Sequence, residues 1–101
     1  MGSYPLGMLK DFNIGVAFIG IGGASVKNGL ADYKFDDVLI KKEVMKRSKK
    51  VIVLADHSKF GYIDPIKIGD LNSVDQIRTS HGINNCDKLI LERSVRIVIV
   101  V

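Results

Sequence analysis

An unbroken apolar run near the middle of this 101-residue chain ends abruptly in polar residues. Residues 51–55 read Val-Ile-Val-Leu-Ala, and the chain then continues with Asp56, His57, Ser58 and Lys59. A short β-branched run bounded by polar turn residues predicts a strand buried on both faces, as in a parallel sheet. In open α/β sheets, ligands bind just beyond the carboxyl ends of such strands. The junction therefore predicts one edge of a ligand site.

The polar side chains at this junction suit an anionic ligand. The ammonium group of Lys59 can hold a phosphate, and Asp56 can fix that lysine or accept a hydroxyl from the ligand, with Ser58 between them. His57 could sense pH or contact a ligand, although a tolerant loop position accounts for it better. A surface turn with an incidental ion pair explains the same residues about equally well.

The remainder of the chain alternates predicted strands with predicted helices. This order predicts βαβ units with right-handed crossovers, and hence an α/β fold with a mostly parallel, Rossmann-like sheet flanked by helices. Besides the strand at 51–55, the predicted strands are residues 14–19, 66–68, 77–79 and 95–101, and the predicted helices are residues 5–11, 36–49 and 86–93.

One lysine of the central predicted helix lies out of place. At helical spacing, Val38, Val44 and Met45 fall on one apolar arc, and Lys41 falls inside it. Such a lysine either extends its apolar stem to the surface or meets a partner in the ligand site. Asp37 lies one turn earlier, at the spacing that brings helix side chains together. Lys41 and Asp37 are therefore second-rank candidates for the site.

A glycine-rich loop follows the first predicted strand. Gly22 and Gly23 leave backbone that a ligand can approach closely, although a tight turn explains them equally well. Gly20 and Gly22 match the start of a dinucleotide-binding fingerprint, but Ser25 occupies the third glycine position. The Asn-Gly turn at residues 28–29 also prevents a helix from starting promptly. We therefore expect no nicotinamide or flavin cofactor.

Four motifs follow one another in a recognisable order. Residues 16–23 read Val-Ala-Phe-Ile-Gly-Ile-Gly-Gly, residues 28–30 read Asn-Gly-Leu, residues 37–41 read Asp-Val-x-x-Lys, and residues 56–61 read Asp-His-Ser-Lys-Phe-Gly. Together they resemble the C-terminal effector-sensing domain of DeoR-type bacterial transcriptional repressors. The last motif is similar to that domain's Asp-x-Ser-Lys-Phe-Gly signature.

The resemblance implies both a fold and a missing part. Such repressors have an N-terminal winged helix-turn-helix that binds operator DNA, followed by a sensor domain related in fold to sugar-phosphate isomerases and deaminases. Residues 13–101 would be the second half of that sensor domain, and residues 1–12 a start segment with a short helix. The helix-turn-helix, and the Ser/Gly/Thr-rich loop that holds the phosphate in the related enzymes, have no counterpart in this sequence.

The implied function is recognition of a phosphorylated sugar from carbohydrate catabolism, without a cofactor. The effector would shift the repressor's affinity for its operator, with the coupling passing through a homo-oligomer. The residues that would bind it are Lys59, Asp56, Ser58, Gly22, Gly23, Lys41 and Asp37. On this interpretation the chain is not an enzyme and contacts operator DNA only through the missing module.

A fragment of a sugar-phosphate isomerase or deaminase is the alternative. Abstraction of a proton next to a carbonyl needs a positioned base. The loop at residues 22–27, where the related isomerases keep acids, contains no Asp or Glu. We therefore favour a sensor over an enzyme.

Charge and composition argue against DNA binding, metal binding and a membrane-spanning helix. The net charge is +4, with basic residues concentrated between residues 41 and 50, but a solvated helix face explains this run better than a DNA-reading surface. Cys86 is the only cysteine and matches no zinc spacing, so we expect neither an internal disulfide nor a metal site. No apolar run reaches the ~20 residues of a membrane helix and no signal peptide is evident, so we expect a cytoplasmic protein.

Overall fold

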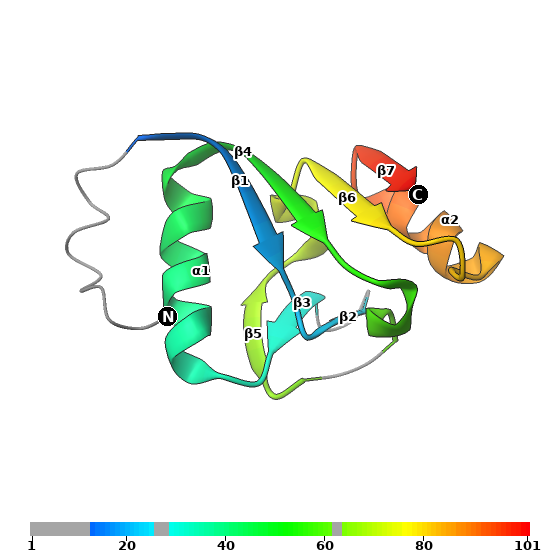
Figure 1. Ribbon diagram of the computed structural model, residues 1–101, viewed down its shortest axis with the longest axis horizontal. Coiled ribbons are helices and arrows are strands. Elements are labelled where there is room, and N and C mark those ends of the chain that lie inside the picture. The colour runs from blue at the N-terminus through cyan, green and yellow to red at the C-terminus, as the bar shows by residue number, and fades with distance from the viewer. Residues whose placement is uncertain (1–12, 26–28, 62–63) are drawn as a thin grey trace.

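The computed structural model describes residues 13–25, 29–61 and 64–101 (Figure 1). The start segment and the helix predicted at residues 5–11 lie outside these ranges. The described elements are β1 (Ile14–Gly20), β2 (Gly23–Ser25), β3 (Gly29–Asp32), α1 (Phe35–Arg47), β4 (Ser48–Leu54), β5 (Ile66–Gly69), β6 (Gln76–Thr79), α2 (Asn85–Ser94) and β7 (Ile97–Val100). Two short 3-10 turns, η2 (His57–Lys59) and η3 (Leu71–Ser73), follow β4 and β5.

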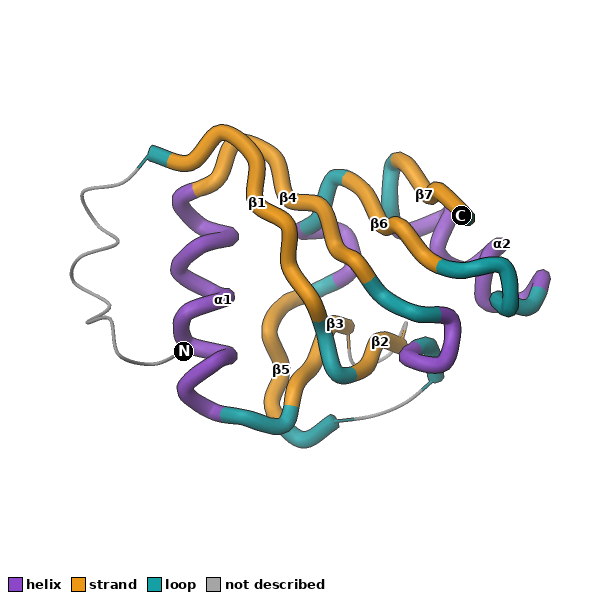
Figure 2. The backbone as a smooth tube through the Cα atoms, in the orientation of Figure 1, coloured by secondary structure: helices purple, strands orange, loops and turns teal. Residues whose placement is uncertain are grey.

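The larger sheet has four strands in the order β1-β4-β6-β7, and every neighbouring pair is parallel. Parallel neighbours need long crossover connections, and α1 and α2 supply the helices of two of them. Figure 2 shows α1 alongside β1 and β4, with α2 close to β7. The predicted α/β fold with a mostly parallel sheet is therefore confirmed.

A second, smaller sheet was not predicted. Its three strands, in the order β2-β3-β5, are antiparallel, and β2 and β3 form a hairpin where the sequence predicted only a glycine loop. β5 matches the predicted strand at residues 66–68, but it pairs with β3 rather than with the parallel sheet. Strands of three or four residues carry too little periodicity for a sequence pattern to specify their partners.

α1 begins and ends where its charges favour a helix. Asp36 and Asp37 occupy its first turn and Lys46 and Arg47 its last, as the helix dipole prefers. The helix was predicted to continue to residue 49 but ends at Arg47, because the chain from Ser48 pairs with β1. The predicted inner arc is confirmed for Val38, which is buried, while Val44 and Met45 are partly buried against the core.

The hydrophobic core lies on one face of the parallel sheet. Ala17, Val53 and Ile77 from three strands belong to the same buried cluster as Val38 of α1 and Leu91 of α2. Neither of these α-helices, among the described residues, is long and apolar enough to cross a membrane.

The opposite face of the sheet is only partly covered by the described residues. Phe18 is 59% exposed, Leu54 45% and Ile97 41%, although all three are large apolar side chains. The expectation that the run at residues 51–55 is buried therefore holds for four of its residues and is wrong for Leu54. Parallel sheets are normally covered on both faces, so this side is suited to contact another segment or subunit.

Two isoleucines on opposite faces of the sheet test this description. Replacing fully buried Ile77 by alanine should lower the free energy of unfolding by about 2–5 kcal/mol, because it leaves a cavity in the core. Replacing Ile97, on the neighbouring strand but 41% exposed, should cost less than about 1 kcal/mol. Urea denaturation measures both changes. Equal losses would contradict a core confined to one face.

Candidate functional site

Because β1, β4 and β6 are parallel, their carboxyl ends lie at one edge of the sheet. Gly22 follows β1, the predicted ligand loop follows β4, and Ser80 follows β6. The loop after β4 is held against β6 at its start, since the backbone N–H of Ala55 donates to the carbonyl of Arg78 at 3.0 Å. The site is built at this edge.

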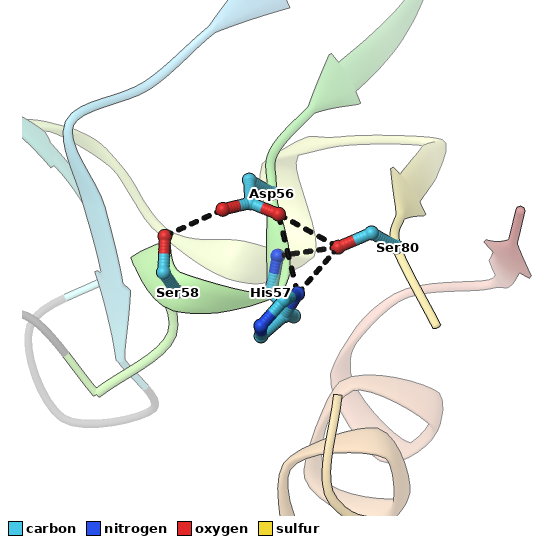
Figure 3. A network of polar contacts seen from close by, with 4 residues as sticks. All are labelled: Asp56, His57, Ser58 and Ser80. Carbon is cyan, nitrogen blue, oxygen red and sulfur yellow. Dashed lines mark hydrogen bonds and ion pairs between the residues drawn. The ribbon is translucent and has the colours of Figure 1, made fainter. Parts of the chain in front are cut away.

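A polar network joins the two loops (Figure 3). The Asp56 carboxylate accepts hydrogen bonds from the hydroxyls of Ser58, at 2.6 Å, and Ser80, at 2.7 Å. The backbone N–H of His57 donates to the Ser80 oxygen at 3.0 Å, and the ring Nδ1 of His57 lies 2.6 Å from that oxygen. Since the Ser80 hydroxyl gives its single proton to Asp56, Nδ1 is the donor in the last contact.

These hydrogen bonds decide the role of Asp56. Donors from Ser58 and then Ser80 lower the pKa of this exposed carboxyl to about 2, so it is ionised at neutral pH. Both carboxylate oxygens are used to hold the turn, and no ion pair joins Asp56 to Lys59 among the described residues. Asp56 therefore positions the loop, and the expectation that it fixes the lysine is wrong.

The other members of the signature also have structural roles. Phe60 packs against the core and forms a parallel bridge with Ala24 of β2. The N–H of Gly61 donates to the Ala24 carbonyl at 2.8 Å, and its φ of 83° is one that glycine adopts readily. The signature thus ties the loop after β4 to the hairpin after β1.

Within the signature at residues 56–61, Lys59 differs in that its ammonium group takes no part in the contacts described above. Its side chain makes no ion pair with any residue in the described ranges. It lines a pocket of about 300 Å³. The other lining residues are Gly22, Tyr33, Ser58 and Asp64. Lys59, Ser58 and Gly22, predicted from distant parts of the sequence, therefore share one pocket.

The remaining predicted site residues lie elsewhere. Gly23 is buried in β2, paired with Ala31, and does not line the Lys59 pocket. Lys41 and Asp37 line a different hollow, of about 600 Å³, at the start of α1. The four-residue spacing of Asp37 and Lys41 suggested a pair, but the carboxylate that Lys41 binds is that of Asp32.

Burial and charge act in opposite directions on Asp32. Its side chain is only 8% exposed, and burial by itself raises the pKa of the carboxyl. Hydrogen bonds from Lys41 and from the backbone N–H of Tyr33, with the charges of Lys41 and Lys34, outweigh burial and hold the pKa below its ordinary value. Lys41 thus neutralises a buried acid and is not a free cation for a ligand.

Sequence analysis missed Asp32, Tyr33, Asp64 and Ser80. Ser80 could have been found, because it follows a predicted parallel strand just as Asp56 does. Asp32 and Tyr33 depend on the unpredicted hairpin, and Asp64 reaches Gly22 only through the tertiary fold. No local pattern in the sequence marks these three residues.

Comparison with known proteins identifies the family. The model for the DeoR C terminal sensor domain matches residues 1–81. This chain belongs to that family. The match includes the first twelve residues, which sequence analysis set apart, and stops before α2 and β7.

Three relatives show how far the likeness extends. The HTH-type transcriptional repressor GlcR of Bacillus subtilis is 32% identical over 87% of this chain and 34% of its own length. The deoxyribose operon repressor of Escherichia coli is 31% identical over 66% of the chain and 27% of its own length. The glycerol-3-phosphate regulon repressor of Haemophilus influenzae is 22% identical over 98% of the chain. The DeoR-family chain spans 27–39% of the length of these relatives.

Removal of a donor to Asp56 tests the network. In Ser80→Ala the pKa of Asp56 should rise from about 2 towards its ordinary value of 3.8. A depressed pKa stabilises the fold above the ordinary value, and this contribution is lost as the pH falls from about 4 to about 2, so the variant should be less sensitive to acid there. Carboxyl ¹³C shifts in an NMR titration report the pKa. Ser73→Ala, which removes an exposed hydroxyl bonded to the Asp70 carbonyl, should leave it unchanged.

Removal of the Lys41 charge should raise the pKa of Asp32. In Lys41→Gln, burial remains while the cation is lost, so the pKa should rise above its ordinary value of 3.8. Ionised Asp32 would then oppose folding, and stability would fall as the pH rises above about 4, whereas Asp32 in the native chain adds stability above about pH 4. Thermal unfolding at several pH values measures this. Lys42→Gln, at an exposed position of α1, serves as the control.

Proposed function

We propose that this chain is the effector-binding part of a DeoR-family transcriptional repressor, and that its effector is a phosphorylated sugar. The observation that carries the proposal is the ammonium group of Lys59, which lacks an ion pair within residues 13–25, 29–61 and 64–101 and lies at the carboxyl edge of the parallel sheet, in a pocket shared with Ser58 and Gly22. Lysine is a compact cation suited to a phosphate, and ligands of open α/β sheets bind at this edge.

The surroundings of Lys59 support an anionic ligand. The acid nearest in sequence, Asp56, is held by Ser58 and Ser80, so it does not compete for the lysine. Of the two acids that approach Gly22, Asp32 is neutralised by Lys41, and Asp64 makes no ion pair with Lys59 in the described part of the chain. Relatives that are named for a deoxyribose operon and a glycerol-3-phosphate regulon make a small phosphorylated metabolite the natural candidate.

The proposed mechanism is a shift between two arrangements of the sensor. A sugar phosphate that binds one arrangement more tightly favours it, and the operator affinity of the whole repressor changes accordingly. Operator DNA would be contacted by a part of the repressor other than this chain. The exposed apolar face around Phe18 and Leu54 offers a surface through which a homo-oligomer could carry the change.

An isomerase or deaminase remains the second candidate, because the structure supplies acids that the glycine loop lacks. Asp32 and Asp64 both approach Gly22, although neither lies in residues 22–27. We favour the sensor because one of the two acids is already paired with Lys41. Incubation of the full-length protein with pentose and hexose phosphates, followed by NMR, should show no turnover; conversion of any of them would favour the enzyme.

Calorimetric titration of the full-length protein with sugar phosphates and the matching unphosphorylated sugars tests the proposal. Only the phosphorylated compounds should bind. Lys59→Gln should weaken binding at least about tenfold, because a charge-assisted hydrogen bond contributes roughly 1.5–3 kcal/mol. Lys46→Gln, which removes the same charge from an exposed position on α1, should bind normally. Unchanged binding by Lys59→Gln would refute the assigned site.

A further inference from the structure

One side-chain oxygen of Asp64 is buried but makes no hydrogen bond to the described part of the fold. Its Oδ2 is buried and has no hydrogen-bond donor among the described residues. A buried carboxylate oxygen without a donor costs free energy, so nearly all such groups in proteins are paired. The sites where such a cost persists are commonly functional.

Gly22 makes the space that this carboxylate occupies. A Cβ atom at residue 22 would collide with Oδ2 of Asp64 and would lie 3.0 Å from Oδ1 of Asp32. The backbone at Gly22 is not in the left-handed region, so the missing side chain matters for space and not for conformation. The glycine therefore admits two acids to the end of β1.

Asp32 and Asp64 differ in the hydrogen bonds that their carboxylate oxygens already accept. Asp32 accepts from the Lys41 ammonium group and, at 2.8 Å, from the backbone N–H of Tyr33. Oδ2 of Asp64 has no hydrogen-bond partner in the described ranges, and Asp64 lines the same pocket as Lys59. No ion pair joins Asp64 to Lys59 in the described part of the chain, so the two residues line the pocket as separate charged groups.

We propose that Asp64 is a specificity-determining residue that accepts a hydrogen bond from a hydroxyl group of the effector, while Lys59 holds its phosphate. This inference rests on the proposed function and names Asp64 as the residue that recognises the sugar part of the effector. A site built to bond a hydroxyl discriminates strongly against ligands that lack one, because its buried acceptor is then left unpaired. The pocket, at about 300 Å³, lies at the small end of ligand sites and suits a small polyol phosphate.

A metal ion is a less suitable occupant of this position. No group of three or more metal-ligating side chains occurs among the described residues. Asp32 is already neutralised by Lys41, which leaves Asp64 as a single available carboxylate. A neutral hydroxyl donor satisfies one oxygen without requiring further ligands.

The test compares sugar phosphates with inorganic phosphate on the full-length protein by calorimetry. Asp64→Asn should weaken binding of the best sugar phosphate of the panel about tenfold or more, while binding of inorganic phosphate, which offers no sugar hydroxyl, stays within about twofold. Lys59→Gln should weaken both. This difference separates a hydroxyl-reading residue from one that merely holds the pocket in shape.

A glycine pair provides a matched second test. Gly22→Ala should displace the Asp64 carboxylate and reproduce the selective loss for the sugar phosphate. Gly20→Ala, two residues earlier with nothing within 4 Å of the added Cβ, should bind normally. Circular dichroism and thermal unfolding confirm that each variant is folded.

The possible outcomes are distinct. Unchanged sugar-phosphate binding by folded Asp64→Asn, or an equal loss for inorganic phosphate, would overturn the role of Asp64 while a dependence on Lys59 leaves the proposed function intact. Failure of the native protein to bind any sugar phosphate would overturn both.

Discussion

Parallel pairing of β1 with β4 and of β4 with β6 is the constraint on which the rest of the structure depends. Antiparallel neighbours would place the carboxyl ends of successive strands at opposite edges of the sheet, whereas parallel neighbours place all of these ends at one edge. Gly22, the signature loop and Ser80 meet there for that reason. The bridge between Phe60 and Ala24 then holds the loop after β4 against the hairpin of β2 and β3, so that Lys59 and Gly22 line one pocket.

Some of the charged side chains near this edge stabilise the fold through their partners, and others are left for a ligand to bind. Asp56 is committed to two serine hydroxyls, and Asp32 to Lys41. Each commitment stabilises the ionised carboxylate and pairs it with a group other than Lys59. Lys59 and the buried oxygen of Asp64, by contrast, have no partner among the residues that the structure describes. A ligand with a phosphate and a hydroxyl matches this pattern, because it supplies a partner to both.

Much of the framework was predictable, and the failures have physical causes. Long or strongly apolar elements such as β1, α1 and β4 were found because periodicity and dipole charges act within a short stretch of chain. The helix end was misplaced because pairing of Ser48 with Ile14, a tertiary interaction, outweighs the helical preference of the residues that follow Arg47. The hairpin of β2 and β3 escaped notice because such short strands are specified by their partners.

The sequence by itself determined the α/β class, the order of the main elements, the family and the candidacy of Lys59, since these follow from patterns that are local in the chain. Only the tertiary structure decided which charges remain available. Lys41 lies nine residues from Asp32, and Asp56 lies 24 from Ser80, so neither pairing is visible as a local motif. Hydrogen bonds and ion pairs act over a few ångströms in space, and the fold alone sets which residues come that close.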